Sequence, residues 1–312
     1  MIISVSRRTD IPAFYLEWFF NRLKEGYVLA RNPMNYKQVS RISLKKEDVE
    51  CFVFWTKNPK HFLENLEKLK YYNYYFQITI TAYDKKIEVG VPRKKEIIKD
   101  FIALSKVVGK EKLVWRYDPI LLSEQIDAKY HIKYFEYMAS KLTGYTDKCV
   151  ISFLDSYSKT KRNTKDLGLR EISSNDMLRI AEGLSKIARE YNIKLESCSE
   201  VIDLASLGIR HGKCIDDKLI SRIIGVNASI DKDKNQRDEC GCVKSVDIGA
   251  YNTCPHLCKY CYANFSLNTA LKNHGMHNPN SPLLFGALRG DEKIIDRKVE
   301  RYFNDVQLSI LD

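Results

Sequence analysis

Short apolar stretches alternate with longer amphipathic stretches along most of this chain. The apolar stretches are rich in β-branched and aromatic residues, which is typical of buried strands. They occupy residues 2–6, 51–55, 75–81, 113–116, 150–154, 193–197 and 245–250. Between several of them, apolar residues recur at the three- and four-residue spacing of an amphipathic helix. These helical patterns cover residues 61–70, 94–108, 131–142 and 175–189.

Capping signals mark the start of two of these helical patterns. Asn58 and Pro59 precede the 61–70 stretch, where they offer an N-cap and a proline for the first turn. Ser173 and Asp176 stand at the start of the 175–189 stretch with the spacing of a capping box. We therefore predict a helix at both places.

Strands that alternate with amphipathic helices predict βα units and a parallel sheet. The chain has 312 residues, 44% of them hydrophobic, and no Gly/Ser-rich linker or internal repeat. Seven strands then predict an α/β fold of the TIM type, a full or partial (β/α) barrel. We assign residues 1–265 to the barrel, including a cysteine-rich region at 198–265. Residues 266–312 are assigned to a C-terminal tail, with a short helix at 291–303.

Lysine and arginine outnumber the acidic residues, and the formal net charge is +11. This charge makes nucleic acid one candidate partner, although much of the lysine is expected on solvated helix surfaces. Residues 158–170 are basic and predicted to form a loop. No apolar stretch reaches the roughly 18 residues of a membrane span. Arg7 and Arg8 follow the first apolar stretch, the wrong order for a secretion signal, so we expect a cytoplasmic protein without a membrane partner.

The nine cysteines are unevenly distributed, and seven of them lie between Cys198 and Cys261. Such clustering in a chain that looks cytosolic favours metal ligation over disulfides. Cys51 and Cys149 each begin an apolar stretch and are predicted to be structural. The remaining seven fall into two groups.

The first group is Cys254, Cys258 and Cys261, in the run TCPHLCKYCYAN. Three thiolates on one short loop can ligate three irons of a [4Fe-4S] cluster and leave the fourth iron open. The alternatives are a plain electron-transfer cluster, or a zinc ion that takes His256 or a distant cysteine as its fourth ligand.

The second group is Cys198, Cys214, Cys240 and Cys242, which come from three separate segments. Four thiolates could close a site around a second [4Fe-4S] cluster or a zinc ion. Gly241 relaxes the backbone between the last two cysteines. The alternative is that all four are buried free thiols.

The first motif, with Tyr260 just before the third cysteine, resembles the cluster motif of radical S-adenosylmethionine (SAM) enzymes. Its CKYCY core is similar to that of spore photoproduct lyases. The run KNQRDECGCVKSVDIGAYNTCPHLCKYCYANFS, together with SVSRRTDIPAFY and VFWTKNP, resembles a bacterial family of unknown function, DUF1848.

The resemblance to radical SAM enzymes implies a chemistry as well as a cofactor. The amino and carboxylate groups of SAM would bind the open iron, and reduction would yield a 5′-deoxyadenosyl radical that abstracts hydrogen from a substrate. The substrate is unknown, and a nucleic-acid base lesion is one candidate. An electron donor such as flavodoxin or ferredoxin is implied as a partner. The competing hypotheses are a non-enzymatic iron–sulfur or zinc protein that binds nucleic acid, and an electron-transfer protein.

The resemblance also suggests residues that bind SAM. Tyr260 would lie beside the adenine, and Arg116 could bind the SAM carboxylate. Glu196 and Glu200 could hold the amino group or the ribose hydroxyls, and Arg237 lies close to Cys240 in the sequence. All but Tyr260 and Arg237 follow or end predicted strands, where barrel active sites are built. Capping and ion-pair roles are the alternatives for these residues.

Two residues are candidates for a direct catalytic role. Cys198 stands at the end of a predicted strand, where it could return a hydrogen atom to a product radical, as a cysteine does in photoproduct lyases. Tyr251 follows the last predicted strand.

The position of the cluster motif differs from that in radical SAM enzymes, where it follows the first barrel strand. Here it follows the last strand, which a circular permutation would explain. The last strand would then lie beside the first, and the cysteine loop beside residues 7–10.

Overall fold

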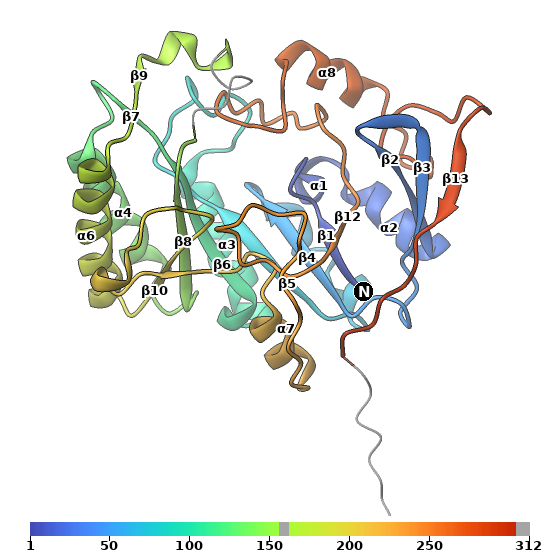
Figure 1. The fold of residues 1–312 in the computed structure, drawn as a ribbon, viewed down its shortest axis with the longest axis horizontal. Coiled ribbons are helices and arrows are strands. Elements are labelled where there is room, and N and C mark those ends of the chain that lie inside the picture. Colours follow the sequence, from blue (N-terminus) through green and yellow to red (C-terminus); the bar gives the residue numbers. More distant parts are fainter. Residues whose placement is uncertain (156–161, 304–312) are drawn as a thin grey trace, which may run out of the picture.

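The structure is built around an eight-stranded sheet in the order β11–β10–β8–β6–β5–β4–β1–β12, with every neighbouring pair parallel (Figure 1). It is a computed structural model that describes residues 1–155 and 162–303. The strands are β1 (Ile2–Val5), β4 (Cys51–Thr56), β5 (Tyr74–Thr79), β6 (Leu113–Ile120), β8 (Lys148–Phe153), β10 (Lys194–Ser197), β11 (Arg210–His211) and β12 (Val246–Asp247). The predicted parallel α/β organisation is therefore correct.

The predicted pairing of the last strand with the first is confirmed. Ile3 of β1 stands opposite Val246 of β12, and Ser4 stands opposite Asp247. The Asp247 carboxylate accepts hydrogen bonds from the hydroxyls of Ser4 and Ser6, at 2.9 and 2.6 Å. This buried contact holds β12 at the edge of the sheet.

A closed TIM barrel is not what the described residues form. Closure would require β11 to pair with β12, but these two strands are the opposite edges of the sheet and are two residues long each. The predicted 245–250 strand is shortened to Val246–Asp247, and Gly249 beyond it packs so closely against Ser6 that a Cβ atom would have no room. The result is a mixed α/β fold with an open parallel sheet.

Four longer helices cover one face of this sheet. They are α2 (Leu16–Glu25), α3 (Lys94–Val108), α4 (Ala128–Leu142) and α6 (Ser174–Glu190). Alternate strand residues meet them: Phe52 packs on Phe19 of α2, with ring centroids 5.4 Å apart, and Trp115 stacks on Phe135 of α4 at 4.7 Å. The apolar side of each helix thus faces the core.

The opposite face of the sheet is covered by the cysteine-rich region. Val53, Tyr75 and Val114 pack there with Ile215 and Leu219, the latter in helix α7 (Asp217–Ile224). Because this region fills the concave side of the sheet, the strands need no further partner to bury their second face.

The capping box predicted for α6 is present, with Ser173 and Asp176 each bonded to the other's backbone N–H. The predicted 61–70 helix is wrong. The segment forms two 3₁₀ helices, at Lys60–Phe62 and Leu66–Leu69. The Asn65 side chain donates to the His61 carbonyl at 2.8 Å, which replaces the backbone bond of a continuous α-helix.

A second, three-stranded sheet lies beside the first and was not predicted. It consists of β2 (Tyr27–Asn32), β3 (Asn35–Ser43) and β13 (Lys293–Asp296). The helix predicted at 291–303 is wrong, because Ile294 and Ile295 pair with the edge of β3 instead. The Arg31–Glu292 ion pair, at 2.7 Å, fastens the chain just before β13.

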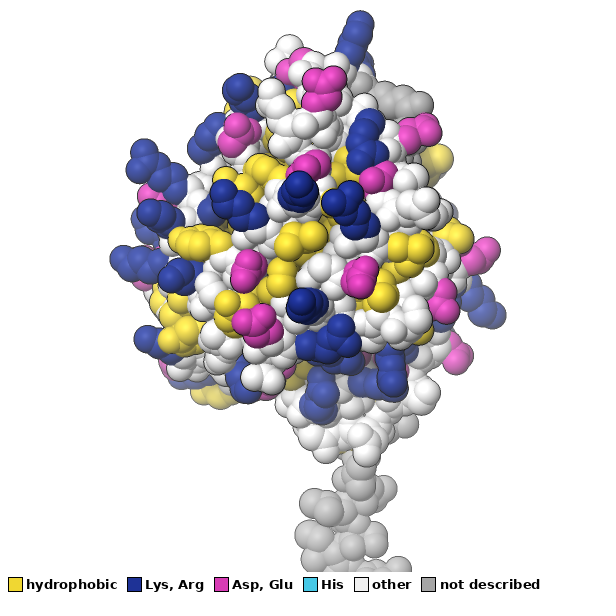
Figure 2. Space-filling view, turned by 90° about the vertical axis from the view of Figure 1, so that its left-hand side faces the viewer, with side chains coloured by type: hydrophobic (Ala, Val, Ile, Leu, Met, Phe, Trp, Pro, Cys, Tyr) yellow, Lys and Arg dark blue, Asp and Glu magenta, His cyan; other side chains and the backbone are white. Residues whose placement is uncertain are grey.

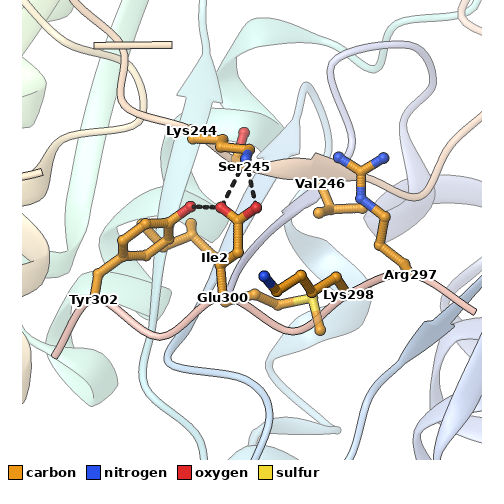
Figure 3. Close-up of a pocket in the computed structure, with 9 residues that line it drawn as sticks. Ile2, Lys244, Ser245, Val246, Arg297, Lys298, Glu300 and Tyr302 are labelled. Carbon is orange, nitrogen blue, oxygen red and sulfur yellow. Dashed lines mark hydrogen bonds and ion pairs between the residues drawn. The ribbon is translucent and has the colours of Figure 1, made fainter. Parts of the chain in front are cut away.

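The C-terminal segment after β13 runs along the amino ends of β1 and β12. There the Glu300 carboxylate accepts from Lys244 Nζ, at 2.6 and 2.7 Å, and from the Tyr302 hydroxyl (Figure 3). This segment belongs to the predicted C-terminal tail, and it packs directly against the eight-stranded sheet.

The remaining elements are short. They are α1 (Ile11–Phe14), β7 (Leu122–Ser123), β9 (Leu169–Arg170), α8 (Leu267–Gly275) and the 3₁₀ helices Lys110–Lys112, Lys165–Leu167 and Ala205–Leu207. Part of the predicted 158–170 loop, residues 158–161, lies outside the described residues. None of the helices in the described ranges has the length and apolar character needed to cross a membrane.

One buried titratable group gives the fold a testable pH dependence. His131 of α4 is fully buried, with Nδ1 2.9 Å from the Tyr117 hydroxyl and Nε2 2.8 Å from the Leu121 carbonyl. Burial lowers the pKa of His131 to about 4. Below pH 6.5 the unfolded chain therefore binds a proton that the folded chain does not, and stability falls as the pH decreases toward 4.

We expect this group to remove about 2 kcal/mol of stability between pH 7 and pH 5. Urea unfolding at both pH values should show a smaller loss in His131→Gln than in the wild type. His61→Gln, at an exposed position, should keep the full loss. An unchanged pH dependence in His131→Gln would contradict this assignment.

Candidate functional site

The loop that carries Cys254, Cys258 and Cys261 lies at the carboxyl edge of the sheet, next to the segments that follow β1 and β5. Lys259 N–H donates to the Ile87 carbonyl at 3.0 Å, and Gly90 N–H donates to the His256 carbonyl at 2.8 Å. The position predicted for this loop, beside residues 7–10, is confirmed by the contact of His256 with Asp10.

Asp10 joins three parts of this edge through one buried carboxylate. Its Oδ1 caps helix α1 by accepting from Ala13 N–H at 2.9 Å. Its Oδ2 accepts from Lys57 N–H, after β4, at 2.7 Å and lies 2.8 Å from His256 Nε2. The cysteine loop is thereby tied to β1 and β4 at once.

Glu88 makes a second buried connection, on the segment between β5 and α3. Its Oε1 accepts from Lys57 Nζ at 2.9 Å and from the Thr81 hydroxyl at 2.8 Å. The Lys94 ammonium and the Tyr260 hydroxyl also donate to this carboxylate. Although burial raises the pKa of Glu88, Lys57 and Lys94 together hold it well below the usual range. Glu88 therefore remains an anion under the cysteine loop.

The three thiols of the loop are close enough to affect one another electrostatically. Cys254 and Cys258 are buried and Cys261 is half-buried. Burial raises the pKa of all three, and Cys261 raises the pKa of the other two further. Lys57 opposes this effect at Cys258 and Cys261. Neighbouring buried thiols of this kind become thiolates when a cation binds them.

His256, the predicted alternative fourth ligand, has both ring nitrogens engaged elsewhere. Nε2 contacts Asp10, and Nδ1 lies 3.3 Å from the Gly90 carbonyl oxygen. The ring is buried and packs edge-on against Phe14. A metal at the three cysteines could take His256 only if these contacts were broken.

The four cysteines of the second group come together on the concave face of the sheet. The sulfur atoms of Cys198 and Cys214 are 3.1 Å apart. Cys242 Sγ accepts from the backbone N–H of Cys214 at 3.2 Å and hydrogen-bonds with Cys240, which lowers the pKa of Cys240 to about 6. Segments separated by more than forty residues thus supply one cluster of thiols.

Arg116 lies at this second group and provides it with a positive charge. Its Nη1 donates to Cys214 Sγ at 2.8 Å and to Gln77 Oε1 at 3.1 Å. Hydrogen bonds from Cys198 and Cys242, and then from Arg116, hold the pKa of Cys214 well below its usual value. Asp118 binds the other side of the guanidinium. Arg116 thus stabilises a thiolate.

Arg7 lies within electrostatic reach of the second cysteine group and contacts Tyr262, the residue that follows Cys261. Burial lowers its pKa, but Asp247, Tyr262, Cys242 and Cys214 raise it to above the ordinary value. The Tyr262 hydroxyl, next to Cys261 in the chain, donates to the Arg7 carbonyl at 3.0 Å. Arg7 thus links the surroundings of the two groups.

The other predicted cofactor-binding residues lie in several places. Tyr260 is buried under the loop, with its hydroxyl on Glu88. Glu200 accepts from Phe153 N–H at 2.8 Å, and burial raises its pKa to about 7. Arg237 pairs with Asp155 at 2.6 Å.

Glu196 and Tyr251 lie at different ends of the sheet. Glu196 pairs with Lys148, the first residue of β8, at 3.1 Å and is held away from the cysteine loop. Tyr251 stacks on Phe265, with ring centroids 5.5 Å apart, and the Arg8 guanidinium lies 5.1 Å from its ring. Tyr251 thus belongs to the surroundings of the cysteine loop and Glu196 does not.

Comparison with known proteins identifies the family of this chain. One family model matches residues 2–263 and so includes both cysteine groups. The chain belongs to DUF1848, a domain of unknown function. No curated protein matches it.

Within residues 1–155 and 162–303 of this DUF1848 chain, no three His, Cys, Asp or Glu side chains are arranged as they would be around a single bound metal ion.

Three residues of the site were not predicted from the sequence: Glu88, Lys94 and Gly90. Their signal is weak, because a buried ion network assembled from distant segments has no local motif. The one available hint is Gly90, two residues before Pro92 in the segment between β5 and α3.

Gly90 allows the DUF1848 cysteine loop to approach closely. A Cβ atom at this position would lie 2.4 Å from the Pro255 carbonyl oxygen and 3.0 Å from His256 Cα. Both are backbone atoms that cannot move aside alone. We expect Gly90→Ala to lower the free energy of unfolding by about 1–3 kcal/mol, measured by urea denaturation.

Gly275→Ala is the matched control, because a Cβ atom there meets nothing within 4 Å. Its stability should stay within about 0.5 kcal/mol of the wild type. Equal stability of Gly90→Ala and wild type would show that the loop is not held in this close contact.

Proposed function

We propose that this protein is a radical SAM-type iron–sulfur enzyme, in which Cys254, Cys258 and Cys261 hold a [4Fe-4S] cluster. The observation that carries the proposal is the set of three neighbouring thiols, two buried and one half-buried, whose nearby histidine, His256, is hydrogen-bonded to Asp10 and Gly90. A site with three protein ligands leaves one iron open for SAM. The spacing of the motif and the softness of thiolate ligands fit iron better than a hard cation.

Bound together, the cluster and SAM would supply a reductive cleavage that yields a 5′-deoxyadenosyl radical for hydrogen abstraction. The residues of the chain would position the cluster and shield it from water. Asp10 and Glu88 hold the loop against the sheet, and the burial of Cys254 and Cys258 keeps water from the cluster. Lys57, near Cys258, would offset part of the cluster's negative charge.

The order of the strands supports a circular permutation relative to radical SAM enzymes. The cysteine loop follows β12, and β12 lies next to β1. In a permuted chain, the loop after the last strand occupies the place that the loop after the first strand has in the parent fold. The edge of the sheet that carries the cluster is then the same in both arrangements.

We further propose that Cys198, Cys214, Cys240 and Cys242 bind a second [4Fe-4S] cluster, with zinc as the alternative metal. The contacts among the four sulfurs and the low pKa of Cys214 support metal ligation over inert thiols. In this proposal Cys198 is a ligand. If the second site holds no metal, Cys198 is instead the proposed hydrogen-atom donor.

The proposed partners are an electron donor such as flavodoxin or ferredoxin and a substrate that binds near Arg7, Arg8 and Tyr251. Arg8 and Tyr251 form a cation–π pair beside the loop. The net charge of +11 favours a second candidate function, a non-enzymatic iron–sulfur or zinc protein that binds nucleic acid. On the face that carries α4 and α6, however, basic side chains are mixed with acidic and apolar ones over most of the view, and gather only in its lower part (Figure 2).

The enzymatic proposal predicts that SAM is cleaved. After anaerobic reconstitution with iron and sulfide, dithionite and SAM should give 5′-deoxyadenosine with the wild type. Cys258→Ala should reduce the yield by more than about 100-fold, because it removes a ligand of the cluster. Cys51→Ala, which truncates a structural thiol, should retain the activity. An intact wild-type cluster that forms no 5′-deoxyadenosine would favour the nucleic-acid-binding function.

The proposal of a second metal site predicts how much metal each chain holds. The wild type should hold about eight iron atoms per chain, and Cys214→Ala should hold about four. Four iron atoms and one zinc ion in the wild type would assign the second site to zinc. Cys149→Ala should not change the metal content. An unchanged metal content in Cys214→Ala would identify the four cysteines as free thiols.

A further inference from the structure

A pocket of about 470 Å³ opens at the amino ends of β6, β8 and β10, away from the cysteine loop. Its walls are the first residues of these strands, the segment Arg210–Lys213 that begins with β11, and the start of helix α7. Ligand pockets of proteins typically have volumes of about 300–1,000 Å³. The pocket is therefore large enough for a small molecule of nucleotide size.

The charge of the pocket is predominantly positive. Seven of its lining residues are Lys or Arg and four are Asp or Glu. Two of the acids are neutralised inside the wall: Lys148 Nζ lies 3.1 Å from Glu196 and 2.9 Å from Asp216, and Lys194 Nζ lies 2.5 Å from Glu196. A third, Asp147, pairs with Lys110 at 2.8 Å. The acidic side chains thus leave a surplus of cations.

Three cations of the wall have no acidic partner in the described part of the chain. They are Arg210, Lys218 and Arg222, and all three are exposed. Guanidinium groups bind phosphate through two parallel hydrogen bonds, and an ammonium group adds a point charge. The N-terminus of α7 does not contribute, because Asp216 already caps the N–H groups of Lys218 and Leu219.

We propose that this pocket binds a small phosphorylated anion through Arg210, Lys218 and Arg222. The concave shape favours a small molecule over an extended nucleic acid. Gly212 lies close to Glu196 in the inner wall of the pocket. A Cβ atom on Gly212 would lie 2.7 Å from Oε2 of Glu196, so the wall is tightly packed here. This site is independent of the cysteine groups and of the chemistry proposed for them.

Isothermal titration calorimetry of the full chain at low ionic strength tests the proposal. The probes are inorganic pyrophosphate, ATP, adenosine and a single-stranded oligonucleotide. We expect binding of pyrophosphate or ATP and no binding of adenosine. The double variant Arg210→Ala/Lys218→Ala should bind the phosphate probes at least about tenfold more weakly, since each cation is expected to form a charge-assisted contact.

The control variant is Lys186→Ala/Arg189→Ala, which removes one lysine and one arginine from exposed positions of α6. It should bind as the wild type does. Thermal melting should show that both double variants fold, because all four side chains are exposed. The proposal is overturned if neither phosphate probe binds, if the Arg210/Lys218 variant binds as tightly as wild type, or if only the oligonucleotide binds.

Discussion

Two buried carboxylates, Asp10 and Glu88, determine where the cysteine loop lies. Glu88 is enclosed by Lys57, Lys94 and Tyr260, and Asp10 contacts His256. A buried charge that loses its partner costs about 3–5 kcal/mol, so these contacts strongly favour this arrangement of the loop. They join the segments after β1, β4 and β5 to a loop more than 150 residues later in the chain. The positions of Cys254, Cys258 and Cys261 depend on them.

The negative charge of buried thiolates would be balanced differently at the two cysteine groups. At Cys254, Cys258 and Cys261, burial raises the thiol pKa. Backbone N–H groups oppose this at Cys254 and Cys261, and Lys57 opposes it at Cys258 and Cys261. These thiols are suited to a site in which a bound metal provides the positive charge. At the second group Arg116 already donates to Cys214. Arg116 therefore already supplies part of the positive charge that a bound metal would provide at this group.

Periodicity was sufficient to predict the alternation of strands and helices, and the spacing of Ser173 and Asp176 predicted the capping box of α6. These features depend on local spacing. The pairing of the last strand with the first was predicted instead from the resemblance to radical SAM enzymes, through the circular permutation. Closure of the barrel was not predictable, because it depends on edge strands of two residues and on a region that fills the concave face. The strand β13 needs the edge of β3, and the anion Glu88 needs Lys57 and Tyr260 from two distant segments. Neither has a periodic signal of its own.

The most direct test of this account is the electron paramagnetic resonance spectrum of the anaerobically reconstituted, reduced protein with and without SAM. If Cys254, Cys258 and Cys261 leave one iron of a [4Fe-4S] cluster open, the spectrum should change when SAM is added. SAM labelled with ¹⁵N at its amino group should then show hyperfine coupling to the cluster. A reduced cluster whose spectrum is identical with and without SAM would contradict the account.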